Sequence, residues 1–146
     1  MKVLLGAAGA LIAASIQAQD CTVAIDSTDQ MRFDRDRIVV SRDCETVEVT
    51  LTHSGRLNVR QMGHNWVLVA SNDLDAVVAE GIRAGFDNGY LKPDDTRVLA
   101  ATELIGGGES TTITFSLDRL DPGGRYEYVC TFPGHSTLMR GEFVLE

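Results

Sequence analysis

The sequence has little positive charge and no long apolar run beyond its first residues, and each shortage excludes a class of function. Thirteen Lys and Arg stand against 21 Asp and Glu, which gives a formal net charge of −8. An acidic surface argues against nucleic acids and anionic membranes as partners. No internal repeat or low-complexity linker is present, and no second apolar run is long enough for a membrane span. We therefore expect one soluble domain without membrane insertion.

The only long apolar run opens the chain and is typical of an export signal. Met1 and Lys2 form a short basic start, residues 3–16 are almost all apolar or small, and polarity begins at Gln19. This order predicts a signal peptide over residues 1–18, cleaved after about Ala18. The run is shorter than the about 20 residues that a span requires, although an uncleaved membrane anchor stays as the alternative. Cleavage leaves residues 19–146, a length typical of one domain.

Three cysteines are an odd number for an exported chain, in which disulfides are expected. Cys21 and Cys44 both lie early, beside polar and turn-prone residues, whereas Cys130 lies in the very different setting Tyr-Val-Cys-Thr-Phe-Pro-Gly-His. We therefore predict a disulfide between Cys21 and Cys44. Cys130 then remains as a free thiol whose purpose has to be explained.

Short segments with strand composition recur between turn signals. The clearest covers residues 45–52, where Val47, Val49 and Leu51 alternate with Thr and Glu, the period of a half-buried strand. The other predicted strands cover residues 22–25, 38–40, 66–69, 111–117, 126–130 and 141–145. The pattern indicates an all-β Greek-key sandwich or flattened barrel, with Trp66 packed in its core.

One segment has a helical rather than a strand-like period. Within residues 73–84, the apolar side chains of Leu74, Val77, Val78 and Ile82 recur on one helix face. Its candidate caps are Ser71 and Asn72 at the start, and its candidate terminators are Gly81 and Gly85. We therefore predict one short helical insertion between strands.

The chemistry is concentrated between Cys130 and Met139, where a thiol, an imidazole and a thioether lie within ten residues. Pro133 and Gly134 can turn the chain so that Cys130 and His135 face a common space. A third ligand has to come from elsewhere, and His64 in Met-Gly-His-Asn-Trp opens another predicted strand. Two His and one Cys with a weak axial Met are the pattern of an electron-transfer copper site. Taken singly, each of these residues is usually structural, but the combination is specific.

Residues 62–68 and 130–135 resemble the two copper-binding segments of azurins, a family within the cupredoxins. Residues 90–95 and 104–106 are also similar, so the resemblance covers residues 19–146. It implies a periplasmic electron carrier with one copper ion, and it supports the predicted disulfide and the Greek-key fold. The metal ligands that it implies are His64, Cys130 and His135, with weak axial contacts from Met139 and from the Gly63 carbonyl.

The resemblance also implies roles for residues around the metal. Asn65 would join the two ligand loops and hydrogen-bond towards the Cys130 sulfur, and the Phe132 N–H would donate to the same sulfur, which raises the reduction potential. His53 matches a non-ligand histidine near the copper, and Ser54 follows it where azurins often have Pro.

An apolar patch around the edge of His135 is implied as the docking surface for transient redox partners, with the protein expected to be a monomer. Gln61 and Thr137 stand where apolar or small residues are expected, so this patch should be more polar here. The residues of the predicted patch are Met31, Leu57, Met62, Phe132, Pro133 and Leu138.

Two other functions remain open at this point. Cys130 and His135 could form the nucleophile–base pair of an enzyme, although no Asp or Glu lies near His135 in the sequence to orient it. Alternatively, the same ligands could serve zinc or copper storage, because zinc also accepts two His and one Cys. We predict the electron carrier, with no substrate transformed.

Overall fold

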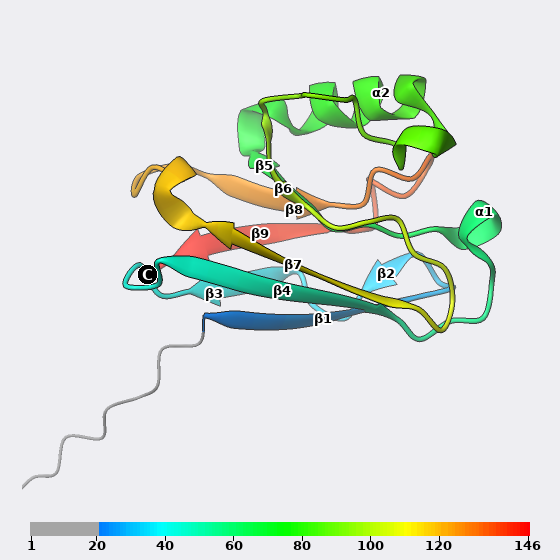
Figure 1. Cartoon of the computed structure of the whole chain (residues 1–146), viewed down its shortest axis with the longest axis horizontal. Coiled ribbons are helices and arrows are strands. Elements are labelled where there is room, and N and C mark those ends of the chain that lie inside the picture. The colour runs from blue at the N-terminus through cyan, green and yellow to red at the C-terminus, as the bar shows by residue number, and fades with distance from the viewer. Residues whose placement is uncertain (1–20) are drawn as a thin grey trace, which may run out of the picture.

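A computed structural model describes residues 21–146, so the predicted signal peptide over residues 1–18 lies outside the described residues. The strands form two sheets that face each other (Figure 1). One sheet has the order β2-β1-β4-β7, and the other has the order β3-β9-β8-β5-β6. The predicted all-β sandwich is therefore confirmed, and its strands form two separate sheets. Among residues 21–146, every helix is too short or too polar to span a lipid bilayer.

All seven predicted strands are present, with small shifts of their ends. Two further strands, β2 and β6, were not predicted, because β2 has only two residues and all four residues of β6 are half-buried without any alternation. The strands are β1 (Thr22–Thr28), β2 (Arg32–Phe33), β3 (Arg37–Val40), β4 (Thr46–His53), β5 (Val67–Ala70), β6 (Val98–Ala101), β7 (Ser110–Ser116), β8 (Tyr126–Val129) and β9 (Arg140–Leu145).

The core lies between the two sheets, and strand β4 shows how the sequence builds it. Val47, Val49 and Leu51 are fully buried, while the residues between them face outwards or are half-buried. Trp66 is also fully buried and stacks on Tyr128, with ring centroids 5.8 Å apart. The prediction that Trp66 packs in the core is therefore correct. Such rigid aromatic packing holds the strand ends in fixed positions.

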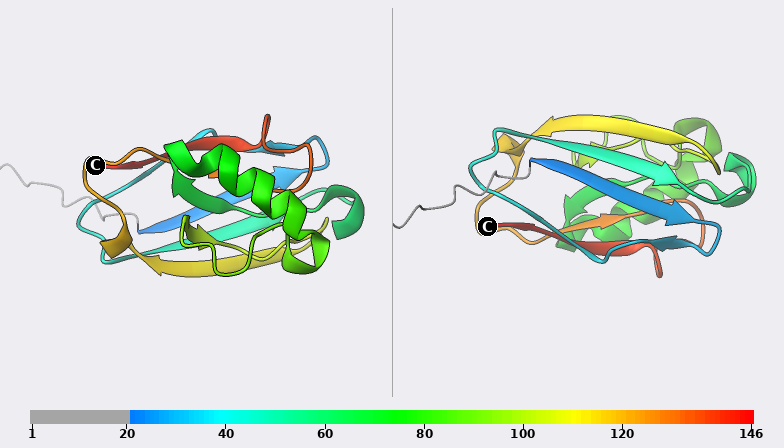
Figure 2. Two further views of the ribbon diagram at one scale, coloured as in Figure 1. Left: turned by 90° about the horizontal axis from the view of Figure 1, so that it is seen from above. Right: turned by 90° about the horizontal axis from the view of Figure 1, so that it is seen from below.

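Helix α2 (Leu74–Ala84) covers the outer face of the five-stranded sheet (Figure 2). Its buried residues Leu74, Val77 and Val78 pack in one cluster with Val67, Val69 and Val129 of that sheet. The predicted period was therefore right, and the helix is the expected insertion.

The predicted helix caps were partly wrong. Ser71 and Asn72 do not cap helix α2, because they belong to a 3-10 turn, η1 (Ser71–Asp73), that precedes it. Gly81 lies inside the helix, where the backbone carbonyl of Tyr90 leaves no room for a Cβ atom. Gly85 does end the helix, as predicted, with a φ of 82° that favours glycine.

Three more short helical turns lie between the longer elements, and none of them was predicted. The turn α1 (Val59–Met62) begins after Asn58, whose side chain accepts hydrogen bonds from the backbone N–H groups of Arg60 and Gln61. This asparagine cap was the available sequence signal. The two other short turns are η2 (Phe86–Asn88) and η3 (Leu117–Arg119).

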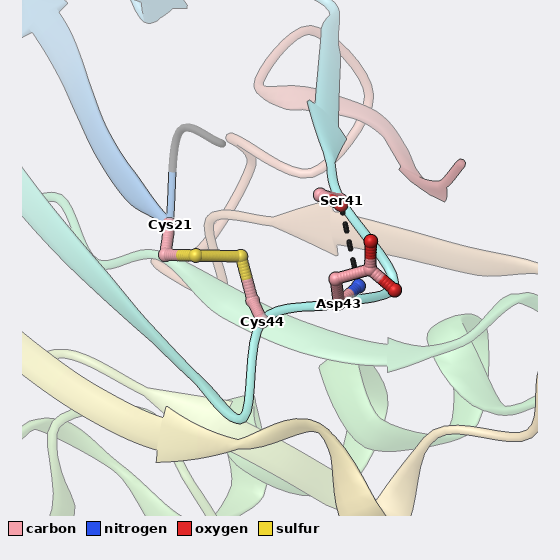
Figure 3. Close-up of a disulfide and its surroundings, with 4 residues drawn as sticks. All are labelled: Cys21, Ser41, Asp43 and Cys44. Carbon is pink, nitrogen blue, oxygen red and sulfur yellow. Dashed lines mark hydrogen bonds between the residues drawn. A yellow bond between two sulfur atoms is a disulfide. The ribbon is translucent and has the colours of Figure 1, made fainter. Parts of the chain in front are cut away.

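The predicted disulfide is confirmed: Cys21 is joined to Cys44 (Figure 3). Cys21 precedes β1, and Cys44 lies just before β4. These two strands are parallel neighbours, with Thr22 opposite Glu48 and Ser27 opposite His53. The disulfide therefore joins one end of the pair, while His53 lies at the other end.

Candidate metal centre

Two segments distant in the sequence bring His64, Cys130 and His135 together at one end of the sandwich, one with His64 and the other with Cys130 and His135. His64 lies between α1 and β5, Cys130 directly follows β8, and His135 lies in the loop before β9. The backbone of His64 exchanges two hydrogen bonds of 2.9 Å with that of Ile105. All three side chains are buried, with at most 3% of their surface exposed. The donors are thus held by regular backbone structure.

The distances between the donor atoms suit a single metal ion. The Cys130 sulfur lies 3.9 Å from Nδ1 of His64 and 3.7 Å from Nδ1 of His135. All three donor atoms lie within 4.8 Å of one another. An ion about 2.0–2.3 Å from each donor, the usual range for nitrogen and sulfur ligands, fits between atoms at these separations.

Both histidines present a free nitrogen lone pair at neutral pH. Nε2 of His64 lies 2.9 Å from the carbonyl oxygen of Thr28. Because that oxygen can only accept, Nε2 carries the proton and Nδ1 is left free towards Cys130. Burial lowers the pKa of His64 to about 4, and burial likewise lowers the pKa of His135 to about 4. Neutral imidazole is the form that binds a metal.

The Cys130 thiol is fully buried, and this burial raises its pKa to about 11. Backbone hydrogen bonds from Asn65 and Phe132 oppose the rise. Without a cation, the group is therefore a protonated thiol at neutral pH. A bound cation favours the thiolate and displaces the proton.

Asn65 joins the two loops that carry His64 and Cys130. Its side-chain oxygen accepts a hydrogen bond of 2.9 Å from the Thr131 N–H, and its amide donates to the Thr131 hydroxyl at 2.8 Å and to the Gly89 carbonyl at 3.1 Å. The side chain thus binds Thr131, whereas the backbone of Asn65 makes the hydrogen bond to Cys130.

Met139 and Gly63, the predicted axial contacts, lie in the segments that carry the donors. Met139 is fully buried, and its backbone binds Cys130 and His135 through hydrogen bonds of 2.9 and 2.8 Å. The Gly63 carbonyl oxygen lies 4.0 Å from the Cys130 sulfur. A side chain at Gly63 would collide with the Val59 carbonyl, which is why glycine is required there.

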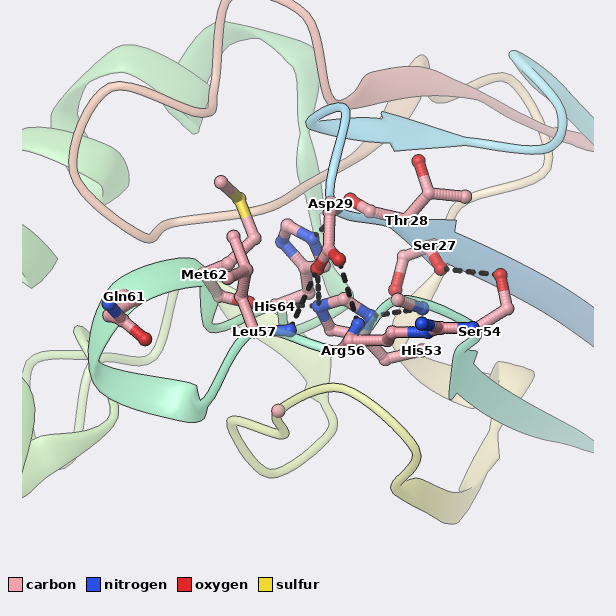
Figure 4. A network of polar contacts seen from close by, with 12 residues as sticks. Ser27, Thr28, Asp29, His53, Ser54, Arg56, Leu57, Gln61, Met62 and His64 are labelled. Carbon is pink, nitrogen blue, oxygen red and sulfur yellow. Dashed lines mark hydrogen bonds and ion pairs between the residues drawn. The ribbon is translucent and has the colours of Figure 1, made fainter.

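The third histidine, His53, has no nitrogen free for a metal (Figure 4). Its Nε2 donates to the Met62 carbonyl at 2.9 Å, and its Nδ1 accepts from the Gly55 N–H at 3.0 Å. The ring stacks on His64, with centroids 4.4 Å apart. His53 therefore supports a donor residue without acting as one.

Two residues of this neighbourhood were missed by sequence reasoning. Thr28 orients His64 through its carbonyl oxygen, and Asp29 accepts backbone hydrogen bonds from Arg56 at 2.8 Å and Leu57 at 3.2 Å (Figure 4). These hydrogen bonds hold the pKa of Asp29 below its ordinary value, and the bond from Arg56 has the largest effect. No sequence signal marks either residue, since their roles follow from the pairing of β1 with β4.

The predicted patch residues differ in their exposure. Leu57 and Leu138 are 39% and 57% exposed. Pro133 is exposed, and Met31, Met62 and Phe132 are half-buried. The Phe132 ring stacks on His135 at 4.5 Å between centroids. Gln61 and Thr137 are exposed.

Comparisons with known proteins agree with this geometry. Residues 19–146 match the family model described as copper binding proteins, plastocyanin/azurin family. An azurin of Pseudomonas chlororaphis is 47% identical over 127 residues, which cover 87% of this chain and 99% of the relative. An azurin of Bordetella pertussis is 48% identical over 136 residues, which cover 93% of this chain and 91% of the relative. All residues of the candidate metal centre lie inside the matched region.

Proposed function

Since the chain belongs to the plastocyanin/azurin family of copper-binding proteins, we propose that His64, Cys130 and His135 hold one copper ion. The protein is a copper electron-transfer protein that exchanges electrons with redox partners. We assign weaker contacts to Met139 and to the Gly63 carbonyl. The observation that carries the assignment is the set of three buried donor atoms within 4.8 Å of one another.

Copper, when bound, supplies one-electron chemistry by alternating between Cu(I) and Cu(II). Thiolate and imidazole ligands can bind copper in either oxidation state. The protein residues keep the donors in place. The hydrogen bonds of His64 to Thr28 and Ile105 fix one donor, and the bonds of Asn65 to Thr131 fix the loop of another. A satisfied buried polar network is rigid, so the donors need little movement when the electron arrives.

Electrons enter and leave, in this proposal, at the edge of His135. This ring is stacked on Phe132 and lies in the loop that carries the exposed Pro133 and Leu138. An apolar surface suits brief encounters, because it is easily desolvated and makes few specific bonds. We place the mature protein in the periplasm because residues 1–18 resemble an export signal and because Cys21 and Cys44 form a disulfide. We also propose that the protein is a monomer.

The enzyme alternative is disfavoured by the state of the thiol. A nucleophilic cysteine needs an accessible, low-pKa sulfur, whereas Cys130 is fully buried and its pKa is raised to about 11. Within residues 21–146, no carboxylate hydrogen-bonds to His135 to orient it as a base. We therefore propose that the protein transforms no substrate.

Titration of the metal-free protein with Cu(II) tests this function. We expect one equivalent to produce an intense blue colour, from charge transfer between the Cys130 thiolate and copper, and ascorbate to bleach it reversibly. The Cys130→Ser variant should lose the colour, and the His53→Gln control should keep it, because His53 offers no free nitrogen. A colourless complex, or tight zinc binding that copper cannot displace, would instead favour metal storage.

A further inference from the structure

The patch that surrounds the candidate metal centre carries positive charge on an otherwise acidic protein. Residues 54–62 and 131–140 carry Arg56, Arg60 and Arg140 but no Asp or Glu, and the third segment of the patch, residues 29–32, carries Asp29 and Arg32. The whole sequence, in contrast, has 13 Lys and Arg against 21 Asp and Glu. The charge of the first two segments is therefore opposite in sign to that of the molecule.

Two of these arginines lie on the segment that carries Leu57 and Met62. Arg56 directly precedes Leu57, and its backbone is tied to Asp29 (Figure 4). Arg60 lies in α1, and its guanidinium is placed 4.1 Å above the centre of the Phe86 ring. Both arginines are exposed, and in residues 21–146 neither forms an ion pair with a carboxylate.

On another side of the patch, three arginines and the exposed Leu138 line a hollow of about 380 Å³. Leu138 is 57% exposed and lines this hollow. Arg35 pairs with Asp34 at 3.5 Å, and Arg140 pairs with Glu127 at 3.0 Å, whereas Arg32 has no carboxylate partner in the described part of the chain. The residues that line the hollow are Arg32, Phe33, Asp34, Arg35, Asp36, Leu138 and Arg140.

We propose that Arg32, Arg56 and Arg60 make this patch a docking surface for an acidic redox protein, whose own docking face carries carboxylates around an apolar centre. The inference rests on the proposed electron-transfer function and adds the charge of the partner. Guanidinium groups pair well with carboxylates and remain charged at every physiological pH. A local field of this kind steers diffusional encounters and orients them, while the apolar centre makes the short-lived contact.

A second copy of this chain is a poorer occupant. Each copy carries a net charge of −8, and its own patch would meet the same arginines on the other copy. Like charges opposite one another disfavour such a contact. A partner with carboxylates complements the patch directly.

Two small redox reagents of opposite charge can test the sign of this field at the metal edge. Oxidation of the reduced copper protein by hexacyanoferrate(III), an anion, and by tris(phenanthroline)cobalt(III), a cation, is followed by stopped-flow as salt is raised. We expect the rate constant for the anion to fall with salt and that for the cation to rise, despite the negative net charge of the protein. The opposite salt dependence would overturn the proposal.

Variants then assign the field to these residues. The triple variant Arg32→Gln, Arg56→Gln and Arg60→Gln should slow oxidation by the anion about tenfold at low salt, within the usual range of electrostatic steering. Arg125→Gln is the matched control, because Arg125 is exposed just before β8 and lines a hollow together with Arg42, two residues from the disulfide cysteine Cys44. A change below about twofold is expected there. Each single variant is also compared with the control. If Arg125→Gln slowed oxidation by the anion as much as Arg56→Gln did, the proposal would be overturned.

Two further measurements separate this inference from its alternatives. Poly-L-glutamate should inhibit oxidation of the wild type by hexacyanoferrate(III) and should have little effect on the triple variant. Self-association in sedimentation velocity that the triple variant abolishes would assign the patch to a second copy and overturn the proposal.

An unchanged blue spectrum and melting temperature show that a variant is intact. A protein that binds no copper would contradict the proposed function itself, whereas an active blue protein with no charge preference would contradict only this inference.

Discussion

Asn65 and Thr131, which are 66 positions apart, bind each other through two hydrogen bonds, of 2.9 Å from the Thr131 N–H and 2.8 Å to the Thr131 hydroxyl. Both residues are fully buried. Each directly follows a proposed copper ligand, His64 or Cys130. The pair therefore continues the antiparallel contact of β5 with β8, which ends at Val67 and Val129, into the two segments that carry the ligands.

The first prediction concerns this pair. Asn65→Leu leaves the buried N–H of Thr131 without a partner, so we expect a loss of about 2–4 kcal/mol in the free energy of unfolding, together with a shifted copper reduction potential. Urea denaturation of the metal-free form and voltammetry of the copper form provide the measurements. Thr131→Val removes only the hydroxyl contact and should cost about 1 kcal/mol. Equal stability of wild type and Asn65→Leu would show that the pair does not hold the loops.

The second prediction concerns the protons released when copper binds. At neutral pH, both ligand histidines are already neutral, because burial lowers the pKa of each to about 4, while the pKa of Cys130 is raised to about 11. Each bound copper should therefore release one proton, from the thiol, at both pH 6 and pH 8. Calorimetry in buffers of different ionisation enthalpy measures this number. Release of two or more protons at pH 6 would mean that a histidine was protonated in the metal-free protein.

The third prediction concerns the stability of the metal-free protein in acid. The pKa values of His64 and His135 are lowered to about 4 in the folded state, below the ordinary value of about 6.5 in an unfolded chain. The unfolded state therefore binds more protons in this window, and stability should fall as pH drops from about 6.5 to 4 and be retained above it. We expect a total loss of about 5 kcal/mol from the two residues over this pH range. Denaturation at several pH values tests this, and His135→Gln should flatten the dependence.

The fourth prediction concerns the disulfide. Replacement of Cys21 and Cys44 by Ala should lower the free energy of unfolding by about 3 kcal/mol, because the closed loop restricts the unfolded chain. The blue colour and the reduction potential should stay unchanged, since the disulfide lies at the opposite end of β1 and β4 from His53. Guanidinium denaturation and the visible spectrum are the measurements. A changed spectrum would indicate that the two ends of the sandwich are coupled.

Local patterns carried much of the fold. The alternation of Val47, Val49 and Leu51 predicted β4, and the helical spacing of Leu74, Val77 and Val78 predicted α2. In each case the buried side chains recur with the period of the strand or helix on which they lie. Strand β6 has four equally half-buried residues, so it has no period to detect. Gly81 was misread as a terminator, since only the approach of the Tyr90 carbonyl explains a glycine inside the helix.

For the site, residue types and their spacing were enough to predict the kind of chemistry: which donor atoms are available, and that the spacing from Cys130 to His135 and Met139 suits one loop. The protonation state and the hydrogen-bond partners of those donors follow from the three-dimensional arrangement. Thr28 acts through a backbone carbonyl that any residue type would supply, so no letter of the sequence marks it. The Asp29 carboxylate binds the backbone N–H groups of Arg56 and Leu57, and this contact depends on which loops meet. Burial sets the pKa values of His64, Cys130 and His135, and the assembly of distant loops creates that burial. Residue identity is a local property, whereas desolvation and hydrogen-bond partners depend on which strand ends meet.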